Sequence, residues 1–129
     1  MPRGSKPKVR SLDRDFRVWS KRLQGICIEN MDFKKLIATY DHPDTLFYLD
    51  PPYVGTESYY KTPSGFNIEQ HVALAEMLKG IKGRFVLSYN DCEVIRDLYK
   101  DYEIIEVSTI YSLRGGNQKA AKELIIKRV

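Results

Sequence analysis

The stretch Leu46-Phe47-Tyr48-Leu49-Asp50-Pro51-Pro52-Tyr53 decides how this sequence is interpreted. Its first half is an apolar and aromatic run that is typical of a buried strand, which we expect from Thr45 to Leu49. Its second half ends the strand, because proline has no backbone N–H to donate to a neighbouring strand. In open, mainly parallel sheets, ligands bind at the carboxyl ends of the strands. The stretch therefore predicts a strand that ends in a ligand site.

The turn Asp50-Pro51-Pro52-Tyr53 has a distinctive hydrogen-bonding chemistry. Two prolines fix the backbone and remove two donors, so the exposed polar groups are acceptors: the Asp50 carboxylate and the carbonyl oxygens of Asp50, Pro51 and Pro52. A rigid acceptor-only corner beside an aromatic ring suits a flat ligand that carries an amino group. Such acceptors can localise the lone pair of an aromatic amine and so favour its attack on an activated methyl group. Alternatively, the tetrapeptide is an ordinary turn and Tyr53 packs on the core.

Strands and helices are expected to alternate on both sides of this turn. The predicted helices are Arg14 to Leu23, Asp32 to Thr39 with Asn30 as its cap, a helix marked by Ile68, Val72, Ala75 and Leu78, and one marked by Val94, Ile95 and Leu98. The other predicted strands are Ile26 to Ile28, Arg84 to Ser88, Glu103 to Val107 and Glu123 to Lys127. The pattern predicts an α/β fold, a partial Rossmann-like sheet that is mostly parallel, with an antiparallel strand near the C-terminus and helices on both faces.

A long polar segment, Val54 to Asn67, follows the turn. Loops of this length in compact domains are usually functional or disordered. Tyr59 and Tyr60 lie in it, and we expect them to offer stacking surfaces to nucleic acid.

Charge is distributed unevenly along the 129 residues, which are enough for one ordinary domain. Residues 1–22 carry a net charge of +6, residues 23–113 a net charge of −6, and residues 114–129 a net charge of +4. Polyanions would meet the basic ends first, so nucleic acid is the expected partner and Arg114 a candidate contact. We expect no metal site, because two cysteines and two histidines match no metal motif, and no membrane span, because the apolar runs are short. Cys27 and Cys92 are expected to be reduced and partly buried.

The segment from Phe47 to Tyr53 resembles motif IV of the amino-directed DNA methyltransferases. The segment Ile68 to Ala75, the block Leu87-Ser88-Tyr89-Asn90-Asp91 and the ending from Gly115 to Ile125 follow in the order found in the Dam-like, D12-class adenine methylases. The resemblance runs from about Trp19 to the end. It implies transfer of a methyl group from S-adenosylmethionine to the exocyclic amine of an adenine flipped out of double-stranded DNA.

The resemblance also implies roles for single residues. Asp50 and the carbonyl of Pro51 would hold the adenine amine, with Pro52 completing the turn, and Tyr53 would stack on the base. Asp32-Phe33 is similar to the segment that borders the cofactor's adenine ring, so these two residues and Asp50 are candidates for cofactor binding. The alternative is that Asp32 only provides charge at a helix start and that Phe33 has helical spacing with the core.

Two further residues, Asn90 and His71, each allow a functional and a structural interpretation. Asn90 would lie at the rim of the site and contact nucleic acid, although an asparagine there is also a routine helix cap. His71 is interpreted as a residue of a helix face rather than as a catalytic base.

The sequence departs from the family in its N-terminal part. The expected glycine-rich turn, of the form Phe-x-Gly-x-Gly, and the acidic residue that follows it are not found. We therefore interpret residues 1–22 as a basic segment with a helix, and residues 23–129 as the C-terminal part of a methyltransferase domain. The absent N-terminal half or a partner subunit would then supply the rest of the cofactor site.

Three functions remain open from the sequence. The first is a cytoplasmic DNA adenine-N6 methyltransferase, or a part of one, of prokaryotic or phage-derived origin. The second is an RNA guanine-amine methyltransferase, because these enzymes also carry Asp-Pro-Pro followed by tyrosine or phenylalanine. The third is a non-catalytic nucleic-acid-binding remnant or partner subunit, whose basic ends would contact phosphates.

Overall fold

The computed structural model describes residues 17–56, 66–112 and 118–129, which fall into two compact units, Met1–Asn30 and Met31–Val129. Helix α1 (Arg17–Leu23) belongs to the first unit and has no buried residue. The strand predicted from Ile26 to Ile28 is wrong: this segment is irregular and exposed. Its alternating apolar residues resemble a strand, but a strand needs a pairing partner, and the described part of the first unit contains none.

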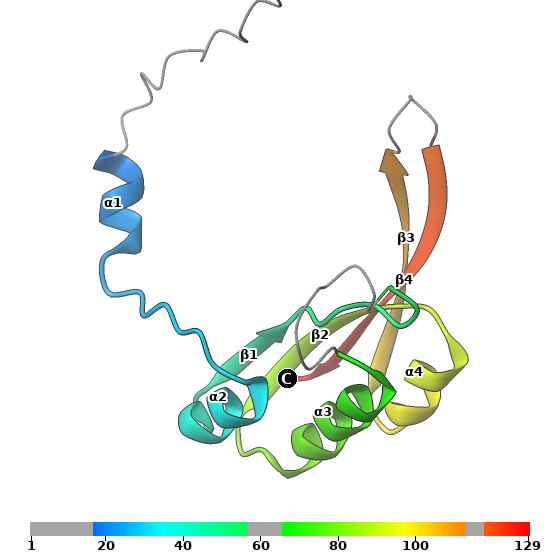
Figure 1. Cartoon of the computed structure of the whole chain (residues 1–129), viewed down its shortest axis with the longest axis horizontal. Helices are drawn as coiled ribbons and strands as arrows, with labels where there is room; N and C mark the ends of the chain where they lie inside the picture. Colours follow the sequence, from blue (N-terminus) through cyan, green and yellow to red (C-terminus); the bar gives the residue numbers. More distant parts are fainter. Residues whose placement is uncertain (1–16, 57–65, 113–117) are drawn as a thin grey trace, which may run out of the picture. The chain divides into compact units, whose positions relative to one another are not determined.

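The second unit contains a four-stranded sheet with the order β1-β2-β4-β3, shown in Figure 1. Its elements are α2 (Phe33–Tyr40), β1 (Leu46–Leu49), α3 (Ile68–Gly80), β2 (Arg84–Asn90), α4 (Glu93–Leu98), β3 (Glu103–Ser112) and β4 (Gln118–Arg128). The predicted alternation of helices and strands is confirmed here. The largest difference in bounds lies in β3 and β4, whose ladder continues to the pair Ser112–Gln118, past the end of β2.

The strand directions confirm a mostly parallel sheet with an antiparallel strand near the C-terminus. Strands β1 and β2 are parallel, and β4 is antiparallel to both of its neighbours, β2 and β3. Three strands therefore run in one direction and β4 runs in the opposite direction. The unit is a mixed α/β structure.

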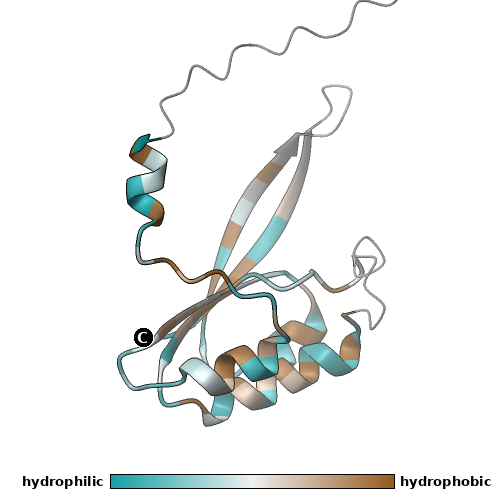
Figure 2. Cartoon of the chain, turned by 60° about the vertical axis from the view of Figure 1, so that its left-hand side comes forward, coloured by the Kyte–Doolittle hydropathy of each residue, from teal (hydrophilic) through white to brown (hydrophobic). Residues whose placement is uncertain are grey.

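Helices on both faces of the sheet were predicted, and for the described residues of the second unit this is wrong. Helices α2, α3 and α4 lie together on one side of the sheet in both views (Figures 1 and 2). The crossovers β1-α3-β2 and β2-α4-β3 both move toward the same edge of the sheet. Right-handed crossovers that advance in one direction leave their helices on one face.

The core lies between the sheet and these helices. Its strand residues alternate with residues on the opposite face: Phe47 is buried, whereas its neighbours Leu46 and Tyr48 are 54% and 73% exposed. The fully or nearly fully buried side chains include Leu74 and Leu78 of α3, Phe85, Leu87 and Tyr89 of β2, Ile95 of α4, and Leu124 and Ile126 of β4. Within the second unit, the second face of the sheet therefore carries exposed side chains at β1. We call it the open face.

Local capping sets where the helices begin. Asp32, rather than the predicted Asn30, is the N-cap of α2, and its carboxylate accepts a hydrogen bond from the Lys34 N–H at 2.9 Å. Asn67 caps α3 by accepting from the Gln70 N–H at 3.2 Å. These side chains satisfy donors that the first turn of a helix leaves unpaired.

Hydrogen bonds and a close backbone contact join the loops that precede β1 and β2. The Asp41 carboxylate accepts hydrogen bonds from the backbone N–H groups of Lys82 and Gly83, which lower its pKa. Gly83 lies so close to the chain that an added Cβ would come within 2.8 Å of the Thr45 carbonyl oxygen. These contacts fix the start of β2 against β1 and thereby the relative position of the two strand ends where the site lies.

Two general expectations concern membranes and metals. None of the helices in the described residues is long and apolar enough to cross a bilayer. The same residues contain no cluster of histidine, cysteine or carboxylate side chains that could hold a metal ion.

Both cysteines are free, but Cys27 is exposed rather than partly buried as predicted, whereas Cys92 is half-buried. The difference at Cys27 has the same cause as the lost strand Ile26 to Ile28.

Candidate functional site

The parallel register of β1 and β2 brings Asp50 beside Ser88. Leu49, the last residue of β1, pairs with Leu87, so Asp50 lies beside the next residue of β2, which is Ser88. The Ser88 hydroxyl donates a hydrogen bond to Oδ1 of Asp50 at 2.9 Å. Ser88 is 6% exposed, whereas Asp50 is exposed. A buried hydroxyl thus holds one oxygen of a carboxylate that remains open to solvent.

Asn90, two residues further along β2, holds the backbone that follows the prolines. Its side-chain oxygen accepts from the Val54 N–H at 2.9 Å, and its side-chain nitrogen donates to the Val54 carbonyl at 3.1 Å. The chain then turns, because the Thr56 N–H donates to the Tyr53 carbonyl at 3.0 Å. Gly55 has a φ of 88°, which the third position of a type II turn requires and which favours glycine. The segment after Tyr53 is therefore fixed by side-chain and backbone bonds.

The Tyr53 hydroxyl lies in a polar cluster that also contains Ser88, Asp50 and Glu123. Burial, followed by the charge and hydrogen bond of Glu123 and the charge of Asp50, raises the pKa of Tyr53 to about 12, while a hydrogen bond with Ser88 opposes the rise. The ring is half-buried and packs against the core. Its position is therefore fixed at both ends, by apolar packing and by the polar cluster.

We expect the substitution Glu123→Gln to lower the pKa of Tyr53 toward its ordinary value of 10.0, because the carboxylate charge that opposes phenolate formation is removed. In the native protein the folded state keeps the phenol proton between pH 10 and pH 12, while the unfolded chain loses it. Stability therefore falls as the pH rises through this window, and the variant should lose less stability there. Tyrosine ring carbons labelled for NMR report the titration directly.

Glu76→Gln is the matched control for that substitution, because Glu76 lies on α3 and its carboxylate bonds to Lys79. It should leave the titration of Tyr53 unchanged. An unaltered Tyr53 titration in Glu123→Gln would show that the two side chains do not interact.

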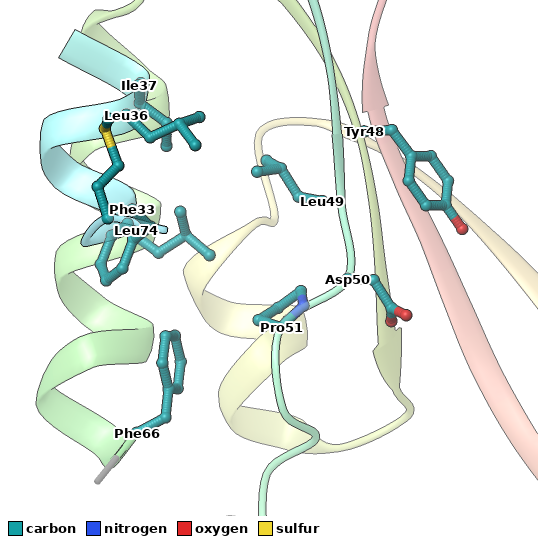
Figure 3. A pocket seen from close by; sticks show the side chains of 10 residues that line it. Phe33, Leu36, Ile37, Tyr48, Leu49, Asp50, Pro51, Phe66 and Leu74 are labelled. Atoms are coloured by element: carbon teal, nitrogen blue, oxygen red, sulfur yellow. The ribbon is translucent and has the colours of Figure 1, made fainter. Parts of the chain in front are cut away.

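An apolar pocket of about 300 Å³ lies on the other side of the end of β1. Its walls come from α2, β1, the proline turn and the start of α3: Met31, Phe33, Leu36, Ile37, Tyr48, Leu49, Asp50, Pro51, Phe66 and Leu74. Figure 3 shows that Leu49 and Pro51 point toward the helices, whereas the Asp50 side chain points away from them. The end of β1 thus separates the apolar pocket from the polar cluster. Asp50 lies at the rim of the pocket and also belongs to the polar cluster.

Two aromatic side chains close the helix side of this pocket. Phe33 and Phe66 have ring centroids 5.8 Å apart, and Phe66 contacts the ring of His71 edge-on at 4.8 Å. His71 is completely buried, and its Nδ1 lies 2.7 Å from the Tyr89 hydroxyl. His71 is therefore a packed residue of α3 that supports the pocket wall, in agreement with its interpretation as a helix-face residue.

The structure brings together some of the predicted site residues. Asp50, Pro51 and Phe33 line the pocket, and Tyr53 contributes its hydroxyl to the polar cluster. Asp32 caps α2 and is not among the lining residues, so its role in cofactor binding stays a prediction. The role of Asn90 in nucleic-acid binding also stays a prediction. Three further candidates, Tyr59, Tyr60 and Arg114, lie outside the described residues.

Sequence reasoning did not single out three residues that build the site. Ser88 is a polar residue inside β2, and its position next to the end of β1 could have identified its role. Phe66 lies just before the α3 cap and could have been assigned to the pocket wall. Glu123 carries no local signal, because β4 reaches the site only through long-range antiparallel pairing with β2.

The chain is similar to known proteins in two comparisons. Residues 3–113 match the family described as D12 class N6 adenine-specific DNA methyltransferase. The chain is also 28% identical over 118 residues to the Retron Ec67 DNA adenine methylase of Escherichia coli. That match covers 88% of this chain and 41% of the relative, so the chain spans less than half of the relative's length. With most of its residues matched, this chain belongs to the D12 class of N6 adenine-specific DNA methyltransferases.

Proposed function

We propose that this chain forms the base-binding part of a methyltransferase that transfers a methyl group from S-adenosylmethionine to the N6 amine of adenine in DNA. The observation that carries the proposal is the position of Asp50 at the end of β1. Its carboxylate is exposed, bonded to Ser88 through one oxygen, and followed by two prolines that leave only acceptors in the turn. Family membership supports the choice of adenine in DNA.

The Asp50 carboxylate and the Pro51 carbonyl would accept the two hydrogen bonds of the adenine amine. Both protons of an exocyclic amine are then held, and the nitrogen lone pair is directed out of conjugation with the ring. Fixed acceptors act mainly by positioning and by stabilising the positive charge that develops on nitrogen. The methylated nitrogen then loses one proton to water, so a strong base is not required.

Tyr53 would stack on the target adenine after it leaves the duplex. Stacking on an aromatic side chain contributes about 1–3 kcal/mol per base. This contribution is comparable with the few kcal/mol that extrusion of a base from the stack costs. The polar cluster that holds the Tyr53 hydroxyl limits the movement of the ring, which favours a preformed stacking surface.

The apolar pocket fits the flat, apolar part of the methyl donor. Its volume of about 300 Å³ and its walls of Phe33, Leu49, Pro51 and Phe66 suit one purine ring system rather than a whole nucleoside with its amino-acid tail. When bound, S-adenosylmethionine supplies an electrophilic methyl group. Phe33 and Phe66 would pack on its adenine, and Pro51 would separate that ring from the target base.

The open face and the outer edge of β1 are proposed to receive the polypeptide that completes the cofactor site. β1 is the edge strand of the described sheet, and Leu46 and Tyr48 on its open face are largely exposed. Unpaired strand edges and exposed apolar faces are surfaces that bind other segments. We infer that the four strands form one side of a Rossmann-like sheet, which an N-terminal half of the same protein or a partner subunit extends.

The product of the reaction tests this proposal against its alternatives. The chain, alone and with the polypeptide encoded directly upstream of it, is incubated with labelled S-adenosylmethionine and unmethylated DNA. We expect the label in N6-methyladenine after digestion of the DNA to nucleosides. An equal assay with RNA serves as the control, and label in a guanine amine of RNA would favour the second enzyme function. Binding of DNA without any methyl transfer would favour the non-catalytic interpretation.

A further inference from the structure

We propose that Ser88 and Asn90 of β2 are positioning residues for methyl transfer, which together hold the Asp50–Tyr53 turn in its reactive geometry. The proposal rests on the proposed function and names two residues that act through others rather than on the substrate. Ser88 holds the carboxylate at the start of the turn, and Asn90 holds the backbone just after its end. Both side chains come from one strand, two residues apart.

Ser88 determines which oxygen of Asp50 is offered to a ligand. Its hydroxyl donates to Oδ1 at 2.9 Å, and among the described residues the structure shows no other hydrogen bond to this carboxylate. Oδ2 therefore remains available to accept an amine proton. Because Ser88 is 6% exposed, water competes poorly for its hydroxyl, and the carboxylate keeps one orientation.

Asn90 determines where the backbone runs after the two prolines. Its amide uses both of its polar atoms on one residue, accepting from the Val54 N–H and donating to the Val54 carbonyl. This pair of bonds replaces the strand pairing that the prolines interrupt. It fixes the residue directly after Tyr53, and thereby the direction from which the Tyr53 ring leaves the chain.

Because Ser88 and Asn90 lie on the same strand, their contacts with the turn act together. In a strand, residues two apart lie on the same face and are about 6–7 Å apart. Ser88 and Asn90 are thus held by the same ladder, in which Ser88 pairs with Ile125 and Asn90 with Glu123. The turn is fixed at its start and just beyond its end by one rigid element, so the two acceptors of the turn keep a constant separation.

The test uses the full chain in whichever preparation shows Asp50-dependent methyl transfer, alone or with the upstream-encoded polypeptide. We expect Ser88→Ala to lower kcat about tenfold while KM for DNA changes less than about twofold, because misplacement affects the reacting groups rather than DNA binding. Ser88→Thr keeps the hydroxyl and should restore most of kcat. Asn90→Ala should lower kcat similarly and increase amide hydrogen exchange at Val54 by about three- to tenfold.

Two controls separate positioning from a general loss of stability. Met77→Ala shortens a half-buried apolar side chain of α3 that packs against the core, and Ser108→Ala removes an exposed hydroxyl on β3. Both should leave kcat and exchange at Val54 near the wild-type values. A wild-type kcat in Ser88→Ala, or unchanged exchange at Val54 in Asn90→Ala, would overturn the proposal while Asp50→Ala still abolished transfer. Methyl transfer that does not depend on Asp50 would instead overturn the proposed function.

Discussion

Replacement of Asp50 by alanine is expected to reduce the rate of methyl transfer to DNA about 10²- to 10³-fold, the range found when one preorganised electrostatic group is removed from an active site. The carboxylate is the strongest acceptor in the turn, and it is exposed where a ligand can reach it. Its loss would remove one of the two proposed hydrogen bonds to the adenine amine, and also the charge that would stabilise a cationic nitrogen. Labelled methyl incorporation, measured at saturating DNA, gives the effect on kcat.

Asp50→Asn sharpens this test because it keeps the size of the side chain and one acceptor oxygen. It should retain more activity than Asp50→Ala if hydrogen bonding dominates, and equally little if the charge dominates. Asp97→Ala, at an exposed position of α4, is the control for the loss of a carboxylate elsewhere. Thermal unfolding should change little in each variant, because an exposed carboxylate with one hydrogen bond contributes about 1 kcal/mol. Wild-type incorporation in Asp50→Ala would exclude the role assigned to this residue.

Much of the fold could be predicted because its signals are local. The apolar run before Asp50 and the run from Phe85 to Leu87 identify two buried strands, and prolines end the first of them. Helix spacing identified α3, and the position of the Asp-Pro-Pro turn at a strand end predicted the site. The family resemblance was carried by the same residues and is confirmed by the match over residues 3–113.

The errors arose where the result depends on distant parts of the chain. The shared direction of two successive crossovers places α3 and α4 on one face, where α2 also lies, and the pattern of a single strand does not report crossover direction. The strand expected at Ile26 failed because pairing requires a partner that its local pattern cannot specify. Glu123 reaches Tyr53 through the register of β4, which is set by a ladder of long sequence separation. Long-range geometry, rather than propensity, determined these outcomes.

The chain by itself is expected to transfer methyl groups at least about 100-fold more slowly than in the presence of a polypeptide that carries a glycine-rich cofactor turn. The described pocket, at about 300 Å³, has room for one purine ring rather than for the whole proposed methyl donor, and methyl transfer requires the donor and the adenine to be placed together. Methyl incorporation into DNA by the chain alone, by the upstream-encoded polypeptide alone, and by the mixture measures this difference. Full activity of the chain alone would show that it needs no further segment.

The open face provides a variant that should fail in the mixture without disturbing the chain itself. Leu46 lies on edge strand β1 and is 54% exposed, so Leu46→Glu adds a charge to the proposed contact surface at little cost to the folded chain. Val94, 41% exposed on α4, lies on the helix side of the sheet, and Val94→Glu is the matched control. We expect Leu46→Glu to lower the activity of the mixture at least tenfold in the conditions where Val94→Glu retains it. A buried glutamate without a partner destabilises an interface by several kcal/mol. Equal activity of the two variants would therefore show that the completing segment binds elsewhere.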